Sequence, residues 1–395
     1  MDPLNGMRVL DFGSFITAPY AAMLLAEYGA DVVKIERPGR GDPFRVFGAG
    51  LYSPQFQAHN KHKRSLVLDY KSEAGRRVLA KLVSGADVVI VNSRPGVAAT
   101  VGLDYDTLRA INDRIVYCAI TGFGETGPYA MRPAFDNVGQ ALSGWMSRFR
   151  TDDDSRVVGP AVSDAATGMH AAMGIMAALL RRVETGKGAR VDVNMIESTI
   201  ALGIEPLTQY LSTGTPVPVF QRAAMSQAYS VTCSDGRRIG LHLSSPPKFW
   251  QSLCKAIDRP QWINEYPERM DRVRGYETLA ALMNEAFSAR PCHEWTSILA
   301  EQDVPFAPEL DLEDLQADPQ ISHLGVFHDV EHPRYGTLRS AHRPVRIDGS
   351  HEEDPRAPPD LGEHTREVLL EAGFTASQVD ELESAGVLGS EKVEA

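Results

Sequence analysis

One acid in the sequence lies where a side chain can do chemistry. Asp164 directly precedes Ala165–Leu180, a run of small and apolar residues whose apolar positions recur at helical spacing. An acid in front of such a run is typical of a helix N-cap, and the loss of a capping side chain costs roughly 1 kcal/mol. A carboxylate at a helix N-terminus is also kept ionised by the helix dipole, which suits a nucleophile. Asp164 therefore has both a structural and a chemical interpretation.

Two glycines in the predicted helix favour the chemical interpretation. Gly168 and Gly174 interrupt a segment built largely of Ala and Met. Glycine weakens a helix interior, so it usually marks the close approach of another backbone or of a ligand. The helix ends before Gly186, and a strand is predicted at Ala189–Met195.

A basic cluster is the second candidate for a site. Lys61, Lys63 and Arg64 form the densest group of cations in a chain whose formal net charge is -12. The cluster is a solvated turn, a chance resemblance to a nuclear-localisation signal or a phosphate-binding site. The net charge argues against nucleic acid or an anionic membrane as the main partner, because no excess of cations exists to neutralise phosphates.

The elements that must position these residues begin with a β-α-β unit. The pattern predicts a strand at Met7–Phe12, a helix at Tyr20–Tyr28 and a strand at Asp31–Glu36. This is the outline of a Rossmann-like fold, but the first turn reads GSFITAP rather than G-x-G-x-x-G. A nicotinamide cofactor, and with it an oxidoreductase, is not supported.

Two later strands, Ala86–Val91 and Ile115–Thr121, are each followed by a glycine-containing loop. In open α/β sheets, ligands bind beyond the carboxyl ends of the strands. We therefore expect a doubly wound sheet with its site along one edge.

A length of 395 residues allows about two domains. The linker-like Ser212–Val219 precedes a predicted hairpin, Tyr229–Cys233 with Arg238–Leu243, and predicted helices at Phe249–Ala256 and Tyr276–Ser288. We predict a large α/β domain, residues 1–211 with 325–395, and a smaller α+β domain, residues 220–324.

The sequence lacks the motifs that are typical of hydrolases, metalloenzymes and kinases. The sequence has no G-x-S-x-G elbow, H-E-x-x-H, P-loop or ligand-spaced Cys/His cluster, so no metal site is predicted. The four cysteines are scattered, the N-terminus lacks a secretory pattern, and no apolar run is long enough to span a bilayer. A cytoplasmic protein with reduced thiols is expected, with a frayed tail at Ser390–Ala395.

The sequence resembles the family III CoA-transferases nearly from end to end. Six segments carry the resemblance beside the Asp164 segment: GADVVKIERPGRGD (29–42), NSRPGV (92–97), GLDYDTL (102–108), ITGFGETGP (120–128), TGKGARVDV (185–193) and PPDLGEHTREVL (358–369). No one segment is specific, but together they are.

The resemblance implies an activity and an assembly. Asp164 matches the family's nucleophile, which attacks an acyl-CoA thioester and forms a mixed anhydride. The CoA thiolate then makes an enzyme–CoA thioester, from which CoA passes to an acceptor carboxylic acid. Coenzyme A and acyl-CoA are thus substrates, no cofactor is permanently bound, and the chain is expected to be an interlocked homodimer with the smaller domain inserted into the large one.

The resemblance also implies a set of CoA contacts. They fall on Phe15, Ile16, Thr17, Arg37, Leu68, Lys71, Asn92, Ser93, Arg94, Thr100, Arg132 and Phe135, with the residues between Leu68 and Lys71 and between Arg132 and Phe135. Arg37 and Lys71 suit CoA phosphates.

Two departures bear on the substrate. The formyl-CoA transferases carry a glutamine where this chain has Ile16, and a mobile glycine-rich loop where it has His242–Pro247. Both departures weaken oxalate or formate as a substrate. His242–Lys248 is expected to face the acceptor acid.

Two rival functions remain open. The 2-methylacyl-CoA racemases share the fold and use a histidine just before an aspartate, where this chain has Phe135 before Asp136. Phe135 cannot move a proton, so the two-base mechanism lacks one base. A non-catalytic CoA-binding protein would need Asp164 to be a plain cap.

Overall fold

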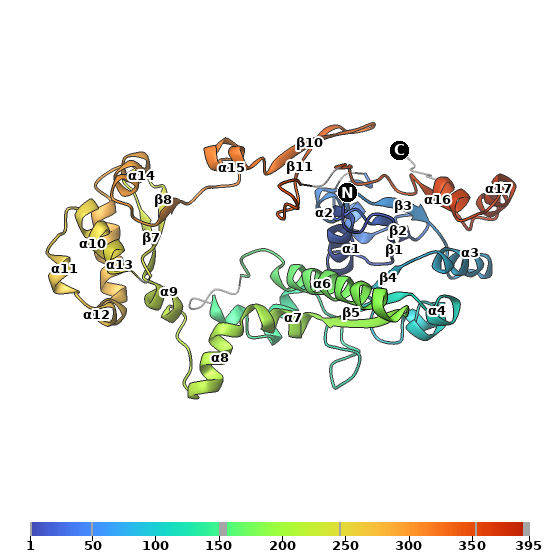
Figure 1. The fold of residues 1–395 in the computed structure, drawn as a ribbon, viewed down its shortest axis with the longest axis horizontal. Helices are drawn as coiled ribbons and strands as arrows, with labels where there is room; N and C mark the ends of the chain where they lie inside the picture. The colour runs from blue at the N-terminus through green and yellow to red at the C-terminus, as the bar shows by residue number, and fades with distance from the viewer. Residues whose placement is uncertain (1, 49, 150–155, 245, 352–353, 390–395) are drawn as a thin grey trace. The chain divides into compact units, whose positions relative to one another are not determined.

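A computed structural model of the protein describes residues 2–48, 50–149, 156–244, 246–351 and 354–389 (Figure 1). The chain divides into two compact units, which are described separately below. The first unit runs up to Leu207 and resumes at Gly325, and the second is Thr208–Leu324. The tail for which fraying was expected, Ser390–Ala395, lies outside the described residues.

A six-stranded parallel sheet forms the centre of the first unit. Its strands are β1 (Arg8–Asp11), β2 (Asp31–Glu36), β3 (Arg64–Val67), β4 (Val88–Val91), β5 (Val116–Thr121) and β6 (Ala189–Asn194). They lie in the order β3-β2-β1-β4-β5-β6, the order of a doubly wound α/β fold. The strand order reverses between β1 and β4, so a ligand site is expected beyond the carboxyl ends of these two strands.

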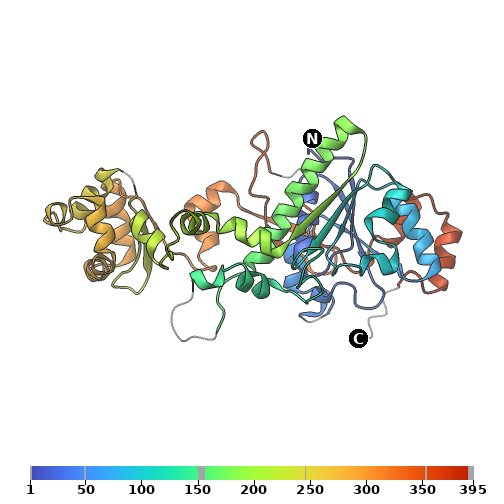
Figure 2. The ribbon, with the colours of Figure 1, turned by 90° about the horizontal axis from the view of Figure 1, so that it is seen from below.

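Helices cover both faces of this sheet, as the view in Figure 2 shows. One face packs on α1 (Thr17–Glu27) and α6 (Val162–Thr185). The other packs on α3 (Glu73–Ser84), α4 (Tyr105–Ile111), α16 (Thr365–Glu371) and α17 (Ala376–Ser384). Because both faces are covered, central strands such as β4 read as unbroken apolar runs.

The first unit also contains shorter elements. They are η1 (Pro43–Val46), α2 (Pro54–Asn60), η2 (Ala98–Val101), α5 (Asp136–Leu142), η3 (Met146–Arg148), α7 (Met195–Leu202) and the antiparallel pair β10 (Phe327–His332) and β11 (Gly336–Ala341). The boundary segments contain α8 (Ile204–Thr213) and α15 (Pro319–Leu324).

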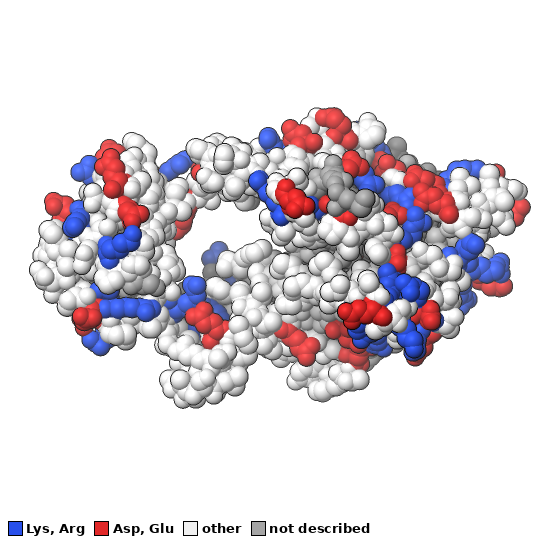
Figure 3. Space-filling model, viewed as in Figure 1, with Lys and Arg blue, Asp and Glu red and all other residues white. Residues whose placement is uncertain are grey.

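Gly168 allows α6 to pack closely on α1. A Cβ atom at Gly168 would lie 2.9 Å from the carbonyl oxygen of Thr17 and 2.9 Å from a ring carbon of Tyr20, closer than real contacts allow. The close approach that this glycine predicted is therefore made by a neighbouring helix. Away from α1, the exposed side of α6 carries Met169, Met173 and Leu180. Figure 3 shows few charged side chains over the middle of α6 and over α7.

The basic cluster is inside the protein, so the interpretations as a solvated turn and as a phosphate-binding site were wrong. Lys61, Lys63 and Arg64 are each less than 10% exposed. The Nζ atom of Lys63 lies 2.8 Å from Asp11, and the guanidinium of Arg64 lies 2.7 Å from Asp31. Lys61 likewise pairs with a buried glutamate. These three cations neutralise carboxylates inside the protein. They are therefore not available to bind a phosphate from solvent.

The second unit packs helices on a three-stranded antiparallel sheet. The strands are β7 (Ala228–Thr232), β8 (Arg238–His242) and β9 (Phe306–Pro308), and the pairing of β7 with β8 confirms the predicted hairpin. The helices are α9 (Gln221–Ser226), α10 (Pro247–Ala256), α11 (Trp262–Glu265), α12 (Arg269–Arg274), α13 (Tyr276–Phe287) and α14 (Cys292–Glu301), with η4 (Leu315–Ala317) after them. Trp250, Phe287 and Trp295 are at the centre of its core.

Candidate active site

A cleft of about 330 Å³ opens at the carboxyl ends of β1, β4 and β5, where the strand order reverses. Its walls are the loops that follow these strands, together with the first turn of α6. Nine of the residues singled out in the sequence line it: Phe15, Ile16, Thr17, Asn92, Ser93, Arg94, Arg132, Phe135 and Asp164. Residues as far apart in the chain as Phe15 and Asp164 therefore meet at one site.

Asp164 does not cap α6, contrary to the expectation from the sequence. The helix begins at Val162, so Asp164 is its third residue, and the N-cap residue Ala161 makes no side-chain cap. The cap comes from Asp136, the first residue of α5. Its Oδ1 atom accepts hydrogen bonds from the backbone N–H groups of Ser163 (2.8 Å) and Asp164 (3.2 Å). The Asp164 carboxylate is thus not occupied by capping.

The pKa of Asp164 is raised to about 7. Burial is the main cause and the neighbouring Asp136 carboxylate is the second, because both disfavour a further negative charge. The sequence had predicted that the helix dipole would hold this carboxylate ionised, and that expectation was wrong. A carboxyl group with a pKa near 7 is about half ionised at neutral pH, and shifts of this size cluster at functional sites.

Apolar side chains share the cleft with Asp164. Phe15, Ile16, Ile120 and Met195 line it, and the ring of Phe135 lies edge-on to that of Phe15 with the centroids 5.8 Å apart. Apolar side chains beside a carboxylate reduce its contact with water, which favours the survival of a reactive acyl intermediate.

The Asn92 side chain holds the wall of the cleft. Its amide oxygen accepts from the backbone N–H of Ser14, and its amide nitrogen donates to the carbonyl of Ser14 and to the hydroxyl of Thr17. These bonds span the Gly13–Thr17 loop, so the predicted ligand residue Asn92 already has three partners within the protein.

A second, smaller cleft adjoins the same loop. It has a volume of about 40 Å³, and its walls include Phe12, Gly13, Ser14, Glu36, Arg37, Asp42 and Tyr70. Ser14 lines both clefts. Arg37 is exposed here, directly after the carboxyl end of β2. The Gly13–Thr17 loop therefore separates an exposed arginine from Asp164.

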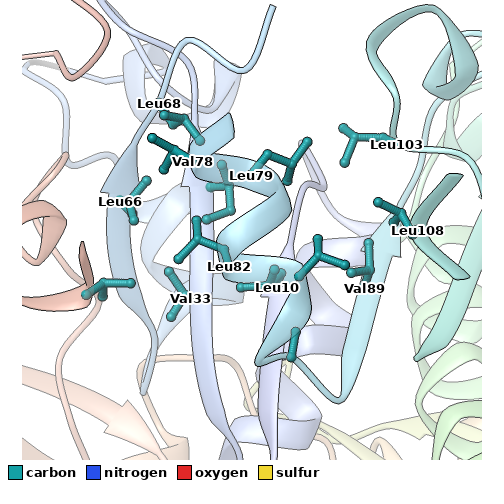
Figure 4. Close-up of a cluster of buried hydrophobic side chains, with 14 of the residues drawn as sticks. Leu10, Val33, Leu66, Leu68, Val78, Leu79, Leu82, Val89, Leu103 and Leu108 are labelled. Carbon is teal, nitrogen blue, oxygen red and sulfur yellow. The ribbon is translucent and has the colours of Figure 1, made fainter. Parts of the chain in front are cut away.

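Four predicted CoA contacts line neither cleft: Leu68, Asp69, Lys71 and Thr100. The side chain of Leu68 is fully buried in the core between the sheet and α3 (Figure 4), so only its backbone can reach a ligand. Lys71 is exposed on the loop before α3. Thr100 lies in η2, where its hydroxyl donates to the carbonyl of Val97 (2.7 Å).

Asp136 is the site residue to which the sequence gave no role. It touches Ser163 through a hydrogen bond that spans 27 residues, and it also accepts from Gln140 on its own helix. The i, i+4 spacing of Asp136 and Gln140 was a local signal for that second bond. No local pattern indicates that Asp136 would cap a helix formed later in the chain.

The segment expected to face the acceptor acid, His242–Lys248, belongs to the second unit. His242 Nε2 lies 2.7 Å from the Ser244 hydroxyl, and Lys248 pairs with Asp303 at 2.8 Å. Ser245 lies outside the described residues. The role of this segment stays a prediction.

The described residues contain neither a membrane-spanning helix nor a cluster of metal ligands. Among the described residues, no helix has the length and apolar character needed to cross a bilayer. Nor do three or more His, Cys, Asp or Glu side chains gather there in a way that could hold a metal ion.

The chain is similar to known proteins over nearly its whole length. The family model described as CoA-transferase family III matches residues 4–365. The chain is 31% identical to succinyl-CoA:glutarate CoA-transferase of Homo sapiens, over 98% of this chain and 90% of the human protein. It is 32% identical to formyl-CoA:oxalate CoA-transferase of Rhodopseudomonas palustris (strain BisA53), over 98% of this chain and 97% of that protein.

A solved structure has the same fold. The crystal structure of a CAIB/BAIF family protein from Brucella suis matches with a TM-score of 0.82 and 29% sequence identity. The match covers 94% of this chain and 99% of the Brucella protein.

Proposed function

The chain belongs to the family III CoA-transferases, and from that premise we propose that it moves CoA from an acyl-CoA to a free carboxylic acid with Asp164 as the nucleophile. The observation that carries the proposal is the environment of Asp164. The carboxylate lines a cleft at the carboxyl end of the sheet, beside apolar side chains, and its pKa is raised to about 7. A raised pKa makes the ionised form more basic and hence a better nucleophile.

The proposed reaction begins with two substitutions at acyl carbons. An ionised Asp164 oxygen attacks the thioester carbonyl of the donor, the C–S bond breaks, and CoA leaves as a thiolate with a mixed anhydride on the enzyme. The thiolate then attacks the aspartyl carbonyl of the anhydride, which releases the donor acid and leaves CoA bound to Asp164 as a thioester.

Transfer to the acceptor repeats these steps in reverse order. The acceptor carboxylate attacks the aspartyl thioester, CoA leaves again, and a new anhydride joins Asp164 to the acceptor. Attack of the thiolate on the acceptor's acyl carbon gives the new acyl-CoA and restores the Asp164 carboxylate. No proton is gained or lost over the cycle, so the site needs no second acid or base.

The first turn of α1 supports this chemistry. The helix starts at Thr17, at the wall of the cleft, and Ile16 gives it no side-chain cap. The first N–H groups of a helix have no partner within it, and such donors stabilise the negative charge that develops on an acyl oxygen.

We further propose that CoA lies along the Gly13–Thr17 loop. Arg37 on one side of the loop would meet a phosphate, and exposed Lys71 directly follows Tyr70 of the same small cleft, while the thioester reaches Asp164 on the other side. Arg94 and Arg132 add exposed cations at the rim of the Asp164 cleft. The large domain, residues 1–211 with 325–395, would then be the CoA-binding domain.

A homodimer is also part of the proposal. Besides the family resemblance, Met173 (53% exposed) and Leu180 (72% exposed) leave an apolar stripe on α6. A stripe of this kind is typical of a surface that another chain covers. Light scattering at micromolar concentration should give the mass of two chains, and an active monomer would remove this part of the proposal.

Racemisation is not proposed, since the described site contains no observation that favours it. Phe135 lines the cleft where that mechanism requires a histidine. Incubation of the enzyme with a 2-methylacyl-CoA in deuterated water should therefore leave the α-proton in place.

Chemical trapping tests the central claim. Incubation with an acyl-CoA and hydroxylamine should convert Asp164 to a hydroxamate, which changes the mass of the peptide that contains it. A parallel assay with glutarate, oxalate and unsubstituted monocarboxylic acids would define the acceptor. Transfer of CoA without any trapped label on Asp164 would show that another group is the nucleophile.

A further inference from the structure

Four buried charged side chains lie beneath the loop that separates the two clefts. This charge network consists of two acids and two lysines, Asp11, Lys34, Asp42 and Lys63, each no more than 3% exposed. The Nζ atom of Lys34 lies 2.9 Å from Asp42, and that of Lys63 lies 2.8 Å from Asp11. The two charges of each sign balance within the network.

Asp11 and Lys34 hold the start of the loop at Gly13. The backbone N–H of Gly13 donates to Asp11 Oδ1 (2.8 Å), and its carbonyl accepts from Lys34 Nζ (2.9 Å). Both backbone groups of one residue are thus fixed by buried charges. Gly13 has no room for a side chain, because a Cβ atom would lie 2.4 Å from the Cβ of Ala18.

Asp42 and Lys63 hold the rest of the segment. Asp42 Oδ1 accepts from the backbone N–H of Phe15 (3.3 Å), and Lys63 Nζ donates to the carbonyl of Pro19 in the first turn of α1 (2.8 Å). Each member of the network therefore bonds to the backbone of residues 13–19.

Phe15 shows why the loop needs such support. Its φ angle is +64°, in the left-handed region that non-glycine residues rarely adopt. A residue held there costs on the order of 1 kcal/mol or more and persists only where its surroundings impose the conformation. The network from one side and Asn92 from the other fix the backbone next to Phe15.

Stability alone does not explain the network. A buried ion pair can often be replaced by apolar residues of similar volume with no loss of stability, because removing charges from water is costly. Here the bonds converge on one segment, and Phe15, Ile16 and Thr17 of that segment line the cleft with Asp164.

We propose that Lys34 and Asp42 are positioning residues for CoA transfer, which fix the Gly13–Thr17 loop at the distance from Asp164 that the acyl group requires. The inference rests on the proposed function of Asp164. Neither side chain needs to touch the substrate, since both act through the backbone of Gly13 and Phe15.

A charge-balanced double variant tests the proposal. Lys34→Met with Asp42→Asn removes one cation and one anion, so the remaining Asp11–Lys63 pair stays neutral. The matched control is Arg64→Met with Asp31→Asn, which removes a partly buried ion pair from the amino ends of β3 and β2. The control pair has no hydrogen bond to residues 13–19.

The double variant should lose turnover rather than affinity. A misplacement of about 1 Å can lower a rate about 100-fold, so kcat should fall roughly 10- to 100-fold while KM for the acyl-CoA changes less than about threefold. The control should keep kcat within about twofold. A folded Lys34→Met/Asp42→Asn enzyme with wild-type kcat would overturn the proposal.

Two further readouts keep the outcomes separate. If the wild-type enzyme forms no hydroxamate at Asp164, the proposed function fails rather than the role of Lys34. If the double variant does not fold, amide hydrogen exchange in the wild-type enzyme decides. The Gly13 and Phe15 amides should exchange as slowly as those of β1, and exchange at the rate of an unprotected loop would refute the role of the network.

Discussion

Two charged regions flank the same loop and follow opposite rules. In the charge network beneath the loop, each buried charge has an opposite charge within 3 Å. In the cleft above the loop, Asp164 has Asp136 as its charged neighbour, and no ion pair joins either carboxylate to a cation among the described residues. Burial is present in both regions, so the difference lies in the neighbours.

The pKa values reflect this difference. Burial acts to raise the pKa of Asp11, but Lys34 and Lys63 bring it below its usual value. Burial also acts to raise the pKa of Asp164, and the neighbouring Asp136 carboxylate raises it further, to about 7. The comparison teaches that paired charges fix geometry here, while an unpaired carboxylate is left available for chemistry.

The largest expected effect comes from removing the unpaired carboxylate. Asp164→Asn keeps the shape of the side chain but cannot attack a thioester, so turnover should fall at least ~10³-fold. The thermal midpoint should stay close to that of the wild type, because Asp164 does not cap the helix. Steady-state kinetics with purified variant and wild-type enzyme measure the loss. Turnover near the wild-type level would show that the unpaired Asp164 carboxylate is not the nucleophile.

A second variant compares an exposed cation with the buried ones. Arg37→Ala should weaken CoA binding by roughly tenfold, about 1.4 kcal/mol, as expected for a charge-assisted contact to a phosphate. Arg40→Ala is the matched control, since Arg40 is exposed in the same loop but lines neither cleft. Titration calorimetry with CoA at low salt gives both constants. Equal dissociation constants for the two variants would show that Arg37 does not bind a CoA phosphate.

A third variant tests the role of Asp136 as a neighbouring charge. The rate of enzyme acylation should rise with pH through about 7, because only the ionised Asp164 attacks. Asp136→Asn removes the like charge and should move this midpoint to lower pH, so that at pH 6 a larger share of the maximal rate is reached. Rapid-quench acylation over pH 5–9 measures both profiles. Superimposable profiles would mean that burial alone sets the pKa of Asp164.

The smallest expected effect concerns stability. Asp136→Ala removes the cap of α6 and should lower the free energy of unfolding by about 1 kcal/mol. Asp164→Ala removes no cap and relieves a carboxylate that is costly to ionise, so it should leave that free energy unchanged or slightly raised. Urea denaturation at pH 7 compares the two. If Asp164→Ala lowered the free energy of unfolding more than Asp136→Ala did, Asp164 rather than Asp136 would be the cap of α6.

Local patterns predicted much of the fold. The predicted strand Asp31–Glu36 has the same bounds as β2, and the hairpin in the second unit was also found. The helix α17 was missed although Thr375 and Gln378 form a capping box at its start, a signal that the sequence contained.

Partners that depend on topology could not be predicted. The sequence shows Lys63 beside Lys61 and Arg64, but it meets Asp11 only because β1 and β3 flank β2 in the sheet. Asp136 likewise reaches Ser163 across 27 residues. The sequence predicted most residue types near Asp164. It did not predict the direction of the Asp164 pKa shift, because that shift depends on burial and on the neighbouring Asp136.

Gly168 offers a point of entry for redesign of substrate scope. It sets how closely α6, which carries Asp164, approaches α1, which follows the Gly13–Thr17 loop. A methyl group added at Gly168 would lie only 2.9 Å from the Thr17 carbonyl oxygen and 2.9 Å from a Tyr20 ring carbon. Thr17 and Tyr20 would therefore have to move away by several tenths of an ångström. The absence of a side chain at Gly168 therefore permits the close spacing of two helices that contribute to the walls of the cleft. An engineer seeking room for a bulkier acid could adjust that spacing without altering any residue that faces the substrate.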